Sequence, residues 1–481
     1  MGMFRRERLF SPGSASRRML LKRGAMLGTG AALANRLEAF AAAGMKPSKE
    51  TATLRQSTPS VDISGTGLKI LQWSHIIPSH DTWFDQFVQE WSAANGVVAT
   101  IDHIAAADIP AAFAAEIAAG QGHDLIEHIA PLAQFEEFVV DLKDLWDEAI
   151  SRYGESAEHC RLNSFNPTTG KYYAFCHGYA PILSNYRKSL WEAIDMPNGP
   201  SSYDGLLDGG ARIYDGQGIQ MGIGMSKEID SQTAALSMIW AFGGAIQDEN
   251  ENVILNSPET IEAVNYMKDL FQACMTPEVL SWNAASNNRL LVADQASYIL
   301  NAISAYRTAQ DNQPNTAADI FFSTPLNGPA GEEHALAPAH AAMSYHIPTH
   351  AKNPDTAREF ILHLLDNYDA ALLASRLYNI PAFPATAPGL DDALENDPNG
   401  SDPADKLLVL KDAANWTVNL GWPGPTNAMT SDAQTSFTLS NMMAKAARDE
   451  MPVSDAVEEA DRLLNESAEK WRTQGLMGGG Q

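Results

Sequence analysis

The sequence has 481 residues, of which 45% are hydrophobic, and this is enough to form two folded domains of ordinary size. Its formal net charge at pH 7 is −26, because 59 acidic residues outnumber 33 basic ones. A chain this acidic repels nucleic acids and anionic membrane surfaces, so we expect neither as a partner.

Residues 1–43 are typical of a twin-arginine signal peptide. Their segment SRRMLLK resembles the twin-arginine export motif, with Leu20 where phenylalanine is commoner. A Gly/Ala-rich apolar stretch follows at 24–33, and small residues that suit cleavage lie at 39–43. No cysteine follows the apolar stretch, so we expect no membrane anchor and a protein free in the periplasm; a disordered basic tail is the alternative. Residues 44–66 are rich in Ser, Thr, Pro and Gly and are predicted to be a linker.

Strands and helices alternate in the next part of the chain. The predicted strands are 68–73, 97–104 and 124–129. Between the first two, bulky side chains recur with helical spacing from Trp83 to Trp91. A second helix is predicted to be capped by Asp108 and to end at Gly120. This alternation predicts a parallel sheet covered by helices.

The later elements are marked by local signals. Residues 171–184 are predicted to form a hairpin of two strands. Ser257-Pro258 and Asn353-Pro354 each combine a capping residue with a proline suited to the first helical turn. Residues 454–471 form an amphipathic pattern, and 391–405 are a polar connection.

One stretch, residues 281–306, combines a polar-aromatic loop, a helix, a strand and a second helix start. The predicted strand covers 296–300, and Asn301 lies where this strand ends. In open α/β sheets ligands bind at such ends. Four asparagines favour a polar, uncharged ligand: Asn283, Asn287, Asn288 and Asn301. Trp282 and Tyr298 are either part of this site or ordinary core.

Common catalytic signatures are absent from the sequence. It contains no phosphate-binding glycine loop, no zinc-protease motif and no nucleophile elbow, although this does not exclude an enzyme. Only His346 and His350 have the spacing of metal ligands on a helix, and Pro348 lies between them, so we expect no metal and no cofactor. The three cysteines form no C-x-x-C pair, and a Cys160–Cys176 disulfide stays open.

Beyond the signal segment, nearly the whole chain resembles the family 1 extracellular solute-binding proteins of ABC importers, the carbohydrate-binding group that includes maltose-binding protein. The likeness rests on the order of several weak motifs. They are the strand ending in Trp73, GQGHDLIEHI at 120–129, GKYY at 170–173 leading to SNY at 184–186, WAFGGAIQD at 240–248, residues 253–257, the Asn301 turn, AREFI at 357–361 and WPGP at 422–425. One departure is Asp294, near where the family usually places glycine.

The resemblance implies an α/β, two-lobed periplasmic-binding-protein fold with a hinge, resembling maltose-binding protein. The lobes would consist of 67–179 plus 327–383, and of 180–326 plus 384–475, with a tail at 476–481. A ligand would bind in the cleft between the lobes, which close on it. The partners it implies are a carbohydrate ligand and the permease subunits of an ABC importer, and we expect a monomer.

The residues that match the family's cleft loops are expected to bind the ligand. They are His75, His80, Glu127, His128, His177, Tyr179, Gln232, Trp240, Trp282, Asn283, Asn301 and Trp422. Aromatic faces pack on sugar rings, and the polar side chains suit hydroxyl groups, so the expected ligand is a sugar, a small oligosaccharide or a polyol.

Three alternatives stay open. Trp240 and Trp422 could support neighbouring helices only. The protein could be a secreted glycan-active enzyme that uses Glu127 with a second carboxylate. The same receptor could also bind an anionic sugar derivative, for which Arg289 and Arg307 lie near in the sequence.

Overall fold

The computed structural model describes Arg55 and residues 58–480. The predicted signal peptide and most of the predicted linker lie outside the described residues. Residues 58–66 of that linker pack against the protein, because Ile63 is buried and the Ser60 backbone N–H donates to Glu359 Oε1 at 2.9 Å. Within the described part of the chain, no helix has the length and apolarity needed to cross a membrane.

The first sheet has seven strands, in the order β12-β6-β11-β3-β1-β2 with β13 paired to β11. The strands are β1 (Gly67–Trp73), β2 (Val98–Ile104), β3 (Leu125–His128), β6 (Phe175–Pro181), β11 (Ala337–His346), β12 (Ile380–Pro381) and β13 (Thr417–Val418). β1 pairs in parallel with β2 and β3, which confirms the predicted parallel arrangement. β11 runs antiparallel to β3 and β6.

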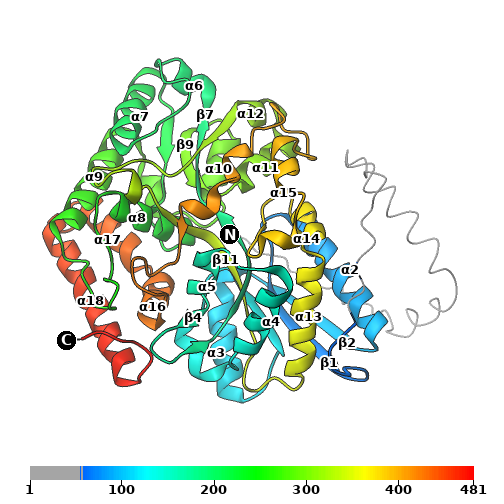
Figure 1. The fold of residues 1–481 in the computed structure, drawn as a ribbon. Helices are drawn as coiled ribbons and strands as arrows, with labels where there is room; N and C mark the ends of the chain where they lie inside the picture. Colours follow the sequence, from blue (N-terminus) through cyan, green and yellow to red (C-terminus); the bar gives the residue numbers. More distant parts are fainter. Residues whose placement is uncertain (1–54, 56–57, 481) are drawn as a thin grey trace, which may run out of the picture. The chain divides into compact units, whose positions relative to one another are not determined.

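Helices α2 (Pro78–Asn95), α3 (Ile109–Ala119) and α13 (Pro354–Asp366) accompany this sheet (Figure 1). The predicted apolar face of α2 is buried from Phe84 to Trp91. Gly120 ends α3 with φ +62°, in the left-handed conformation expected of a C-terminal glycine. Asp108 makes no capping hydrogen bond, because it lies in a short 3₁₀ turn directly before α3.

The second sheet has four strands, in the order β10-β7-β9-β8. The strands are β7 (Leu183–Arg187), β8 (Gln220–Gly222), β9 (Ala296–Asn301) and β10 (Ile320–Ser323). β9 confirms the strand predicted at 296–300. It pairs antiparallel with β7 and parallel with β8. Asn301 is its last residue and lies at its carboxyl end.

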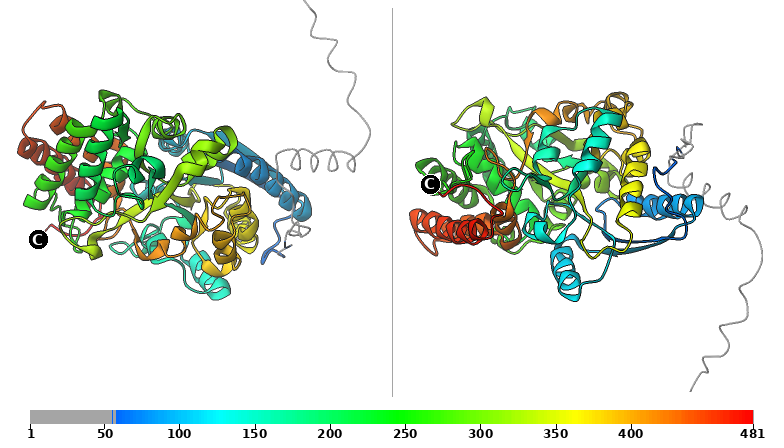
Figure 2. Two further views of the ribbon diagram at one scale, coloured as in Figure 1. Left: turned by 90° about the horizontal axis from the view of Figure 1, so that it is seen from above. Right: turned by 60° about the horizontal axis from the view of Figure 1, so that its bottom comes forward.

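The second sheet carries a thick layer of helices. Its helices are α6 (Lys188–Glu192), α7 (Tyr203–Gln217), α8 (Ile229–Ala241), α9 (Pro258–Cys274), α10 (Ser286–Val292), α11 (Ser304–Asn312), α12 (Pro314–Asp319), α16 (Ala428–Ser436), α17 (Thr438–Ala447) and α18 (Val453–Thr473). As predicted, Ser257 caps α9, since its side chain accepts from the Thr260 N–H. The last helix, α18, lies beside α9 and α17 (Figures 1 and 2).

The remaining elements connect these layers. They are α4 (Lys143–Tyr153), α5 (Glu158–Leu162), α14 (Tyr368–Ala374), α15 (Leu390–Glu395) and the small hairpin of β4 (Phe165–Asn166) and β5 (Lys171–Tyr172).

The hairpin predicted at 171–184 is wrong. β6 and β7 follow each other with only Ile182 between them, but they do not pair, because β6 bonds to β11 and β12 while β7 bonds to β9 and β10. Every residue of β6 is buried. A strand that is covered on both faces lacks the alternation that would distinguish a central strand from a hairpin arm.

The turn before β9 is made by Asp294, where the resemblance expects glycine nearby. Asp294 has φ +61°, a left-handed conformation that Asp adopts more readily than most residues. Its carboxylate accepts from Thr316 Oγ1 at 2.7 Å and pairs with Arg187. These contacts hold the turn without a glycine.

The C-terminal residues pack onto the protein. Leu476 and Met477 are buried. The Gly478 N–H donates to Glu251 Oε2 at 2.7 Å, and Asn166 Nδ2 donates to the Leu476 carbonyl at 2.9 Å. Residues 476–480 therefore join the β4–β5 hairpin to the loop that precedes α9.

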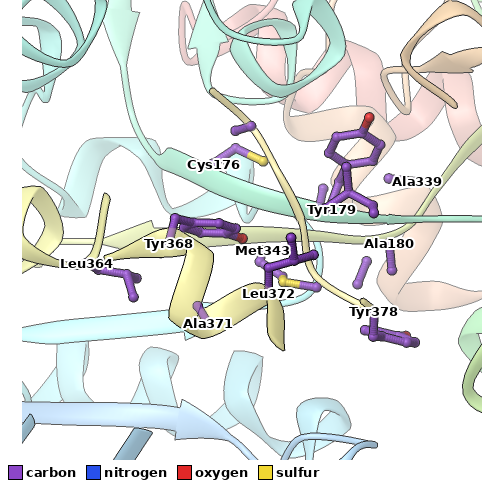
Figure 3. Packing of buried hydrophobic residues seen from close by; sticks show 14 of the residues in the cluster. Cys176, Tyr179, Ala180, Ala339, Met343, Leu364, Tyr368, Ala371, Leu372 and Tyr378 are labelled. Atoms are coloured by element: carbon purple, nitrogen blue, oxygen red, sulfur yellow. The ribbon is translucent and has the colours of Figure 1, made fainter. Parts of the chain in front are cut away.

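The hydrophobic core around Gly178 of β6 leaves no room for a side chain at this position. Figure 3 shows Cys176, Met343 and Tyr368 packed together in this region. A Cβ atom at Gly178 would lie 1.7 Å from the Tyr368 hydroxyl oxygen and 3.0 Å from the Ile380 carbonyl oxygen. Only glycine fits here without displacing Tyr368.

We therefore expect Gly178→Ala to destabilise the protein by about 1–3 kcal/mol, the usual cost of overpacking a core. Thermal unfolding measures this as a lower Tm. Adding Tyr368→Phe to the variant removes the clashing hydroxyl and should recover part of the loss. Gly216→Ala is the matched control, because its Cβ would have no neighbour within 4 Å. An unchanged Tm for Gly178→Ala would contradict this packing.

Candidate functional site

The two sheets meet where the chain passes from β6 to β7. Side chains from the segment after β1, the starts of α2, α8 and α10, the end of β9, the middle of β11 and the segment after α14 converge there. We call this group the junction cluster; it comprises His75, His80, Asp230, Asn287, Asn288, Asn301, His340 and Tyr378.

On the side of the first sheet, aromatic rings surround His75: His80 stacks on it, Trp73 is tilted to it and Tyr378 is edge-on. The His75 ring centroid lies 4.5 Å from that of Trp73, 4.3 Å from that of His80 and 5.3 Å from that of Tyr378. His75 Nδ1 accepts from the Ile77 N–H, so the ring proton lies on Nε2, which donates to Asn379 Oδ1 at 2.9 Å. Burial lowers the pKa of His75 to about 4, which keeps the ring neutral at pH 7.

On the side of the second sheet, Asp230 is the centre of an amide network. Asn287 Nδ2 donates to Asp230 Oδ2 at 2.6 Å, and Asn301 Nδ2 donates to the same oxygen at 3.3 Å. Asn301 also donates to Asn288 Oδ1 at 2.7 Å. Three of the four asparagines singled out in the sequence are therefore brought together.

His340 connects the two sides. Its Nδ1 lies 3.1 Å from Asp230 Oδ1, and its ring is edge-on to Tyr378 at 6.5 Å between centroids. The His340 N–H is not aligned for a hydrogen bond, so Asp230 Oδ1 has no donor among the described residues. Burial raises the pKa of Asp230 to about 7 and lowers that of His340 to about 4.

Glu127 and His177 form a separate buried pair within the first sheet. His177 Nε2 lies 2.6 Å from Glu127 Oε1, and Gln72 Nε2 contacts Glu127 Oε2. The His177 ring stacks on Tyr345 at 4.8 Å. Glu127 is 2% exposed, so these contacts commit its carboxylate to the sheet interior.

Several other predicted ligand-binding residues connect neighbouring helices to one another. Gln232 donates to the Ala433 carbonyl and accepts from the Ser440 N–H, and thereby joins α8 to α16 and α17. Trp240 is fully buried and lies edge-on to Trp422 at 5.8 Å. The geometry agrees with the helix-supporting alternative for these two tryptophans.

The remaining predicted residues differ in their surroundings. His128 Nε2 donates to the Ala106 carbonyl and its Nδ1 accepts from the Ala130 N–H, and the Tyr179 ring is edge-on to His159. Asn283 is exposed, and its side chain accepts from the N–H of Ala285 in the turn before α10. Trp282 is half-buried and packs against two of the hydrophobic clusters of the core.

The two arginines considered for an anionic ligand are engaged elsewhere. Arg307 is 1% exposed and donates to both carboxylate oxygens of Asp397, at 2.6 and 3.2 Å. Arg289 donates to Ser286 Oγ at 2.9 Å on the surface of α10. Neither guanidinium belongs to the junction cluster.

Sequence reasoning missed Asp230, His340 and Tyr378. Asp230 lies in a helix start, SKEIDSQ, whose acidic residues are typical of ordinary caps. His340 lies in a small-residue strand, and Tyr378 follows a short helix, so no spacing rule connected them.

Two further features lie outside the junction cluster. A cavity of about 560 Å³ is lined by α16, α17 and α18, and none of the predicted site residues lines it. The cysteines at 160, 176 and 274 are free and buried. In residues 58–480, no three His, Cys, Asp or Glu side chains are arranged to hold a metal ion.

Solved structures of similar fold come from several bacteria. Maltose-bound MalE3 of T. maritima is 18% identical with a TM-score of 0.69, over 83% of this chain and 99% of that one. A sugar transporter of Arthrobacter chlorophenolicus with bound laminaribiose is 17% identical with a TM-score of 0.68, over 83% and 99%. A solute-binding protein of Agrobacterium radiobacter in complex with ribitol is 16% identical with a TM-score of 0.68, over 85% and 100%.

These similarities confirm the two-lobed periplasmic-binding-protein fold that the resemblance implied. No curated protein matches the sequence. Residues 86–400, which are more than half of the chain, match the family described as bacterial extracellular solute-binding protein. The chain therefore belongs to the bacterial extracellular solute-binding protein family.

Proposed function

We propose that the protein is a receptor that binds a sugar, a small oligosaccharide or a polyol and delivers it to the permease of an ABC importer. The observation that carries this proposal is the continuous line of ring and polar contacts from His75 through Tyr378 and His340 to Asp230, which bridges the two sheets. Its aromatic rings and amides suit the faces and hydroxyls of a carbohydrate. Neighbouring structures that hold maltose, laminaribiose and ribitol support the same ligand class.

We assign one lobe to 67–179 plus 327–383 and the other to 180–326 plus 384–475. The sheets support part of this division, since β7 to β10 all come from 180–326, whereas β13, at 417–418, pairs with β11 of the first sheet. The ligand binds between the lobes and favours their closed arrangement, because a transporter must distinguish a loaded receptor from an empty one. His75, Trp282 and Asn301 contact the ligand together with the rest of the junction cluster.

The surroundings of Glu127 do not favour the glycan-active enzyme. The Glu127 carboxylate is already engaged by His177 and Gln72 within the sheet, which leaves it poorly placed to act on a glycan. The receptor acts as a monomer in the periplasm, and the Arg17-Arg18 pair directs it there by the twin-arginine route.

A thermal-shift series tests the ligand class. A ligand at a thousandfold excess over its dissociation constant stabilises the folded protein by roughly 4 kcal/mol, which should raise Tm by several degrees. We expect such a rise for at least one neutral sugar or polyol, with the ligand recovered unchanged. A folded protein whose Tm responds to no sugar or polyol would refute the proposed function, and turnover of the ligand would favour the enzyme instead.

His340→Ala tests the position of the site. Loss of a polar contact worth about 1.5–3 kcal/mol should weaken binding of the sugar that gives the largest shift by roughly 10- to 100-fold in isothermal titration calorimetry. His123→Ala is the matched control, since His123 pairs with Glu116 and Asp102 and contacts no member of the junction cluster. Equal affinities of both variants and the native protein would place the ligand elsewhere.

A further inference from the structure

The junction cluster contains one carboxylate oxygen, Asp230 Oδ1, without a matching donor in the described part of the chain. Asp230 is 4% exposed; Asn287 and Asn301 donate to its Oδ2, and its Oδ1 has no donor among the described residues. Glu228 is 6% exposed and accepts from the backbone N–H groups of Asp230 and Ser231. Two carboxyl groups are thus buried close together at the start of α8.

No cationic side chain compensates these carboxyl groups. In the part of the chain that the structure describes, neither Asp230 nor Glu228 forms an ion pair with a lysine or arginine. His340 approaches Asp230, but its low pKa keeps it neutral at pH 7. A buried carboxylate without a counter-charge is unfavourable, and folded proteins normally supply a cation or several donors to it.

The surroundings of Asp230 suit a cation. The Tyr378 ring lies next to both His340 and His75, and the pKa of its hydroxyl is raised by burial and, to a smaller extent, by the charge of Asp230. An aromatic ring near a bound ammonium group adds a favourable electrostatic interaction to that of a carboxylate. The net charge of −26 further attracts cations rather than anions.

We propose that the ligand of this receptor is a sugar or polyol that carries a protonated amine, and that the amine binds at Asp230. This inference rests on the proposed function and narrows its ligand class. An ammonium group donates three hydrogen bonds and neutralises the carboxylate. A hydroxyl group at the same position donates only one, and a carboxylate donates none and is repelled.

Three probes with one carbon skeleton test this inference: sorbitol, its 1-amino-1-deoxy derivative and gluconate. Their affinities for the purified protein are measured by titration calorimetry at pH 8, where Asp230 is largely ionised. We expect the amine to bind at least about tenfold more tightly than sorbitol, and gluconate to bind more weakly than both.

Asp230→Asn keeps the shape of the side chain and removes its charge. We expect the ratio of amine to sorbitol affinity to fall to about one in this variant. Asp208→Asn is the matched control, because Asp208 is exposed on α7, and it should keep the native ratio. If Asp230→Asn does not fold, the order of the three probes on the native protein still decides the question.

The outcomes separate the two proposals. Binding of neutral sugars without a preference for the amine, or an amine preference that survives in Asp230→Asn, overturns the inference and leaves the sugar receptor intact. Absence of binding by every sugar, polyol and amine refutes the proposed function itself.

Discussion

The direct passage of the chain from β6 into β7 determines where side chains of the two sheets can meet. With only Ile182 between them, the two strands enter different sheets, so the two sheets must meet at that point. Backbone hydrogen bonding is satisfied within each sheet, and the side chains at the strand ends are left facing their counterparts. His75, Asp230 and His340 come from distant parts of the sequence and meet only because of this constraint.

Elements with strong local signals could be predicted from the sequence, whereas long-range pairings could not. The strand at 296–300, the cap at Ser257 and the glycine at 120 each depend on neighbouring residues, and the structure confirms them. The supposed hairpin at 171–184 failed because strand partners more than a hundred residues away decide the pairing of β6. Asp230 and His340 were missed for the same reason, since only the fold brings them together.

The buried carboxylates of the first sheet and of the junction cluster differ in how their charge is compensated. Glu127 has a histidine and a glutamine to share its charge, so its burial is balanced within one lobe. Asp230 has only amides, and its remaining oxygen faces His340 from the other sheet. A buried carboxylate oxygen without a donor is energetically costly, and a donor that reached it would relieve this cost.

The folded-back C-terminus has a practical consequence for sensor construction. Residues 476–480 bond to both the β4–β5 hairpin and the loop at Glu251. A fluorescent protein or a surface-immobilisation tag fused there would therefore disturb both of these segments. Gly478 itself tolerates no side chain, because a Cβ atom added there would lie 2.4 Å from Glu251 Oε2. A long flexible spacer would preserve these contacts, so the choice of spacer decides whether the signal reports ligand binding or damage to the tail.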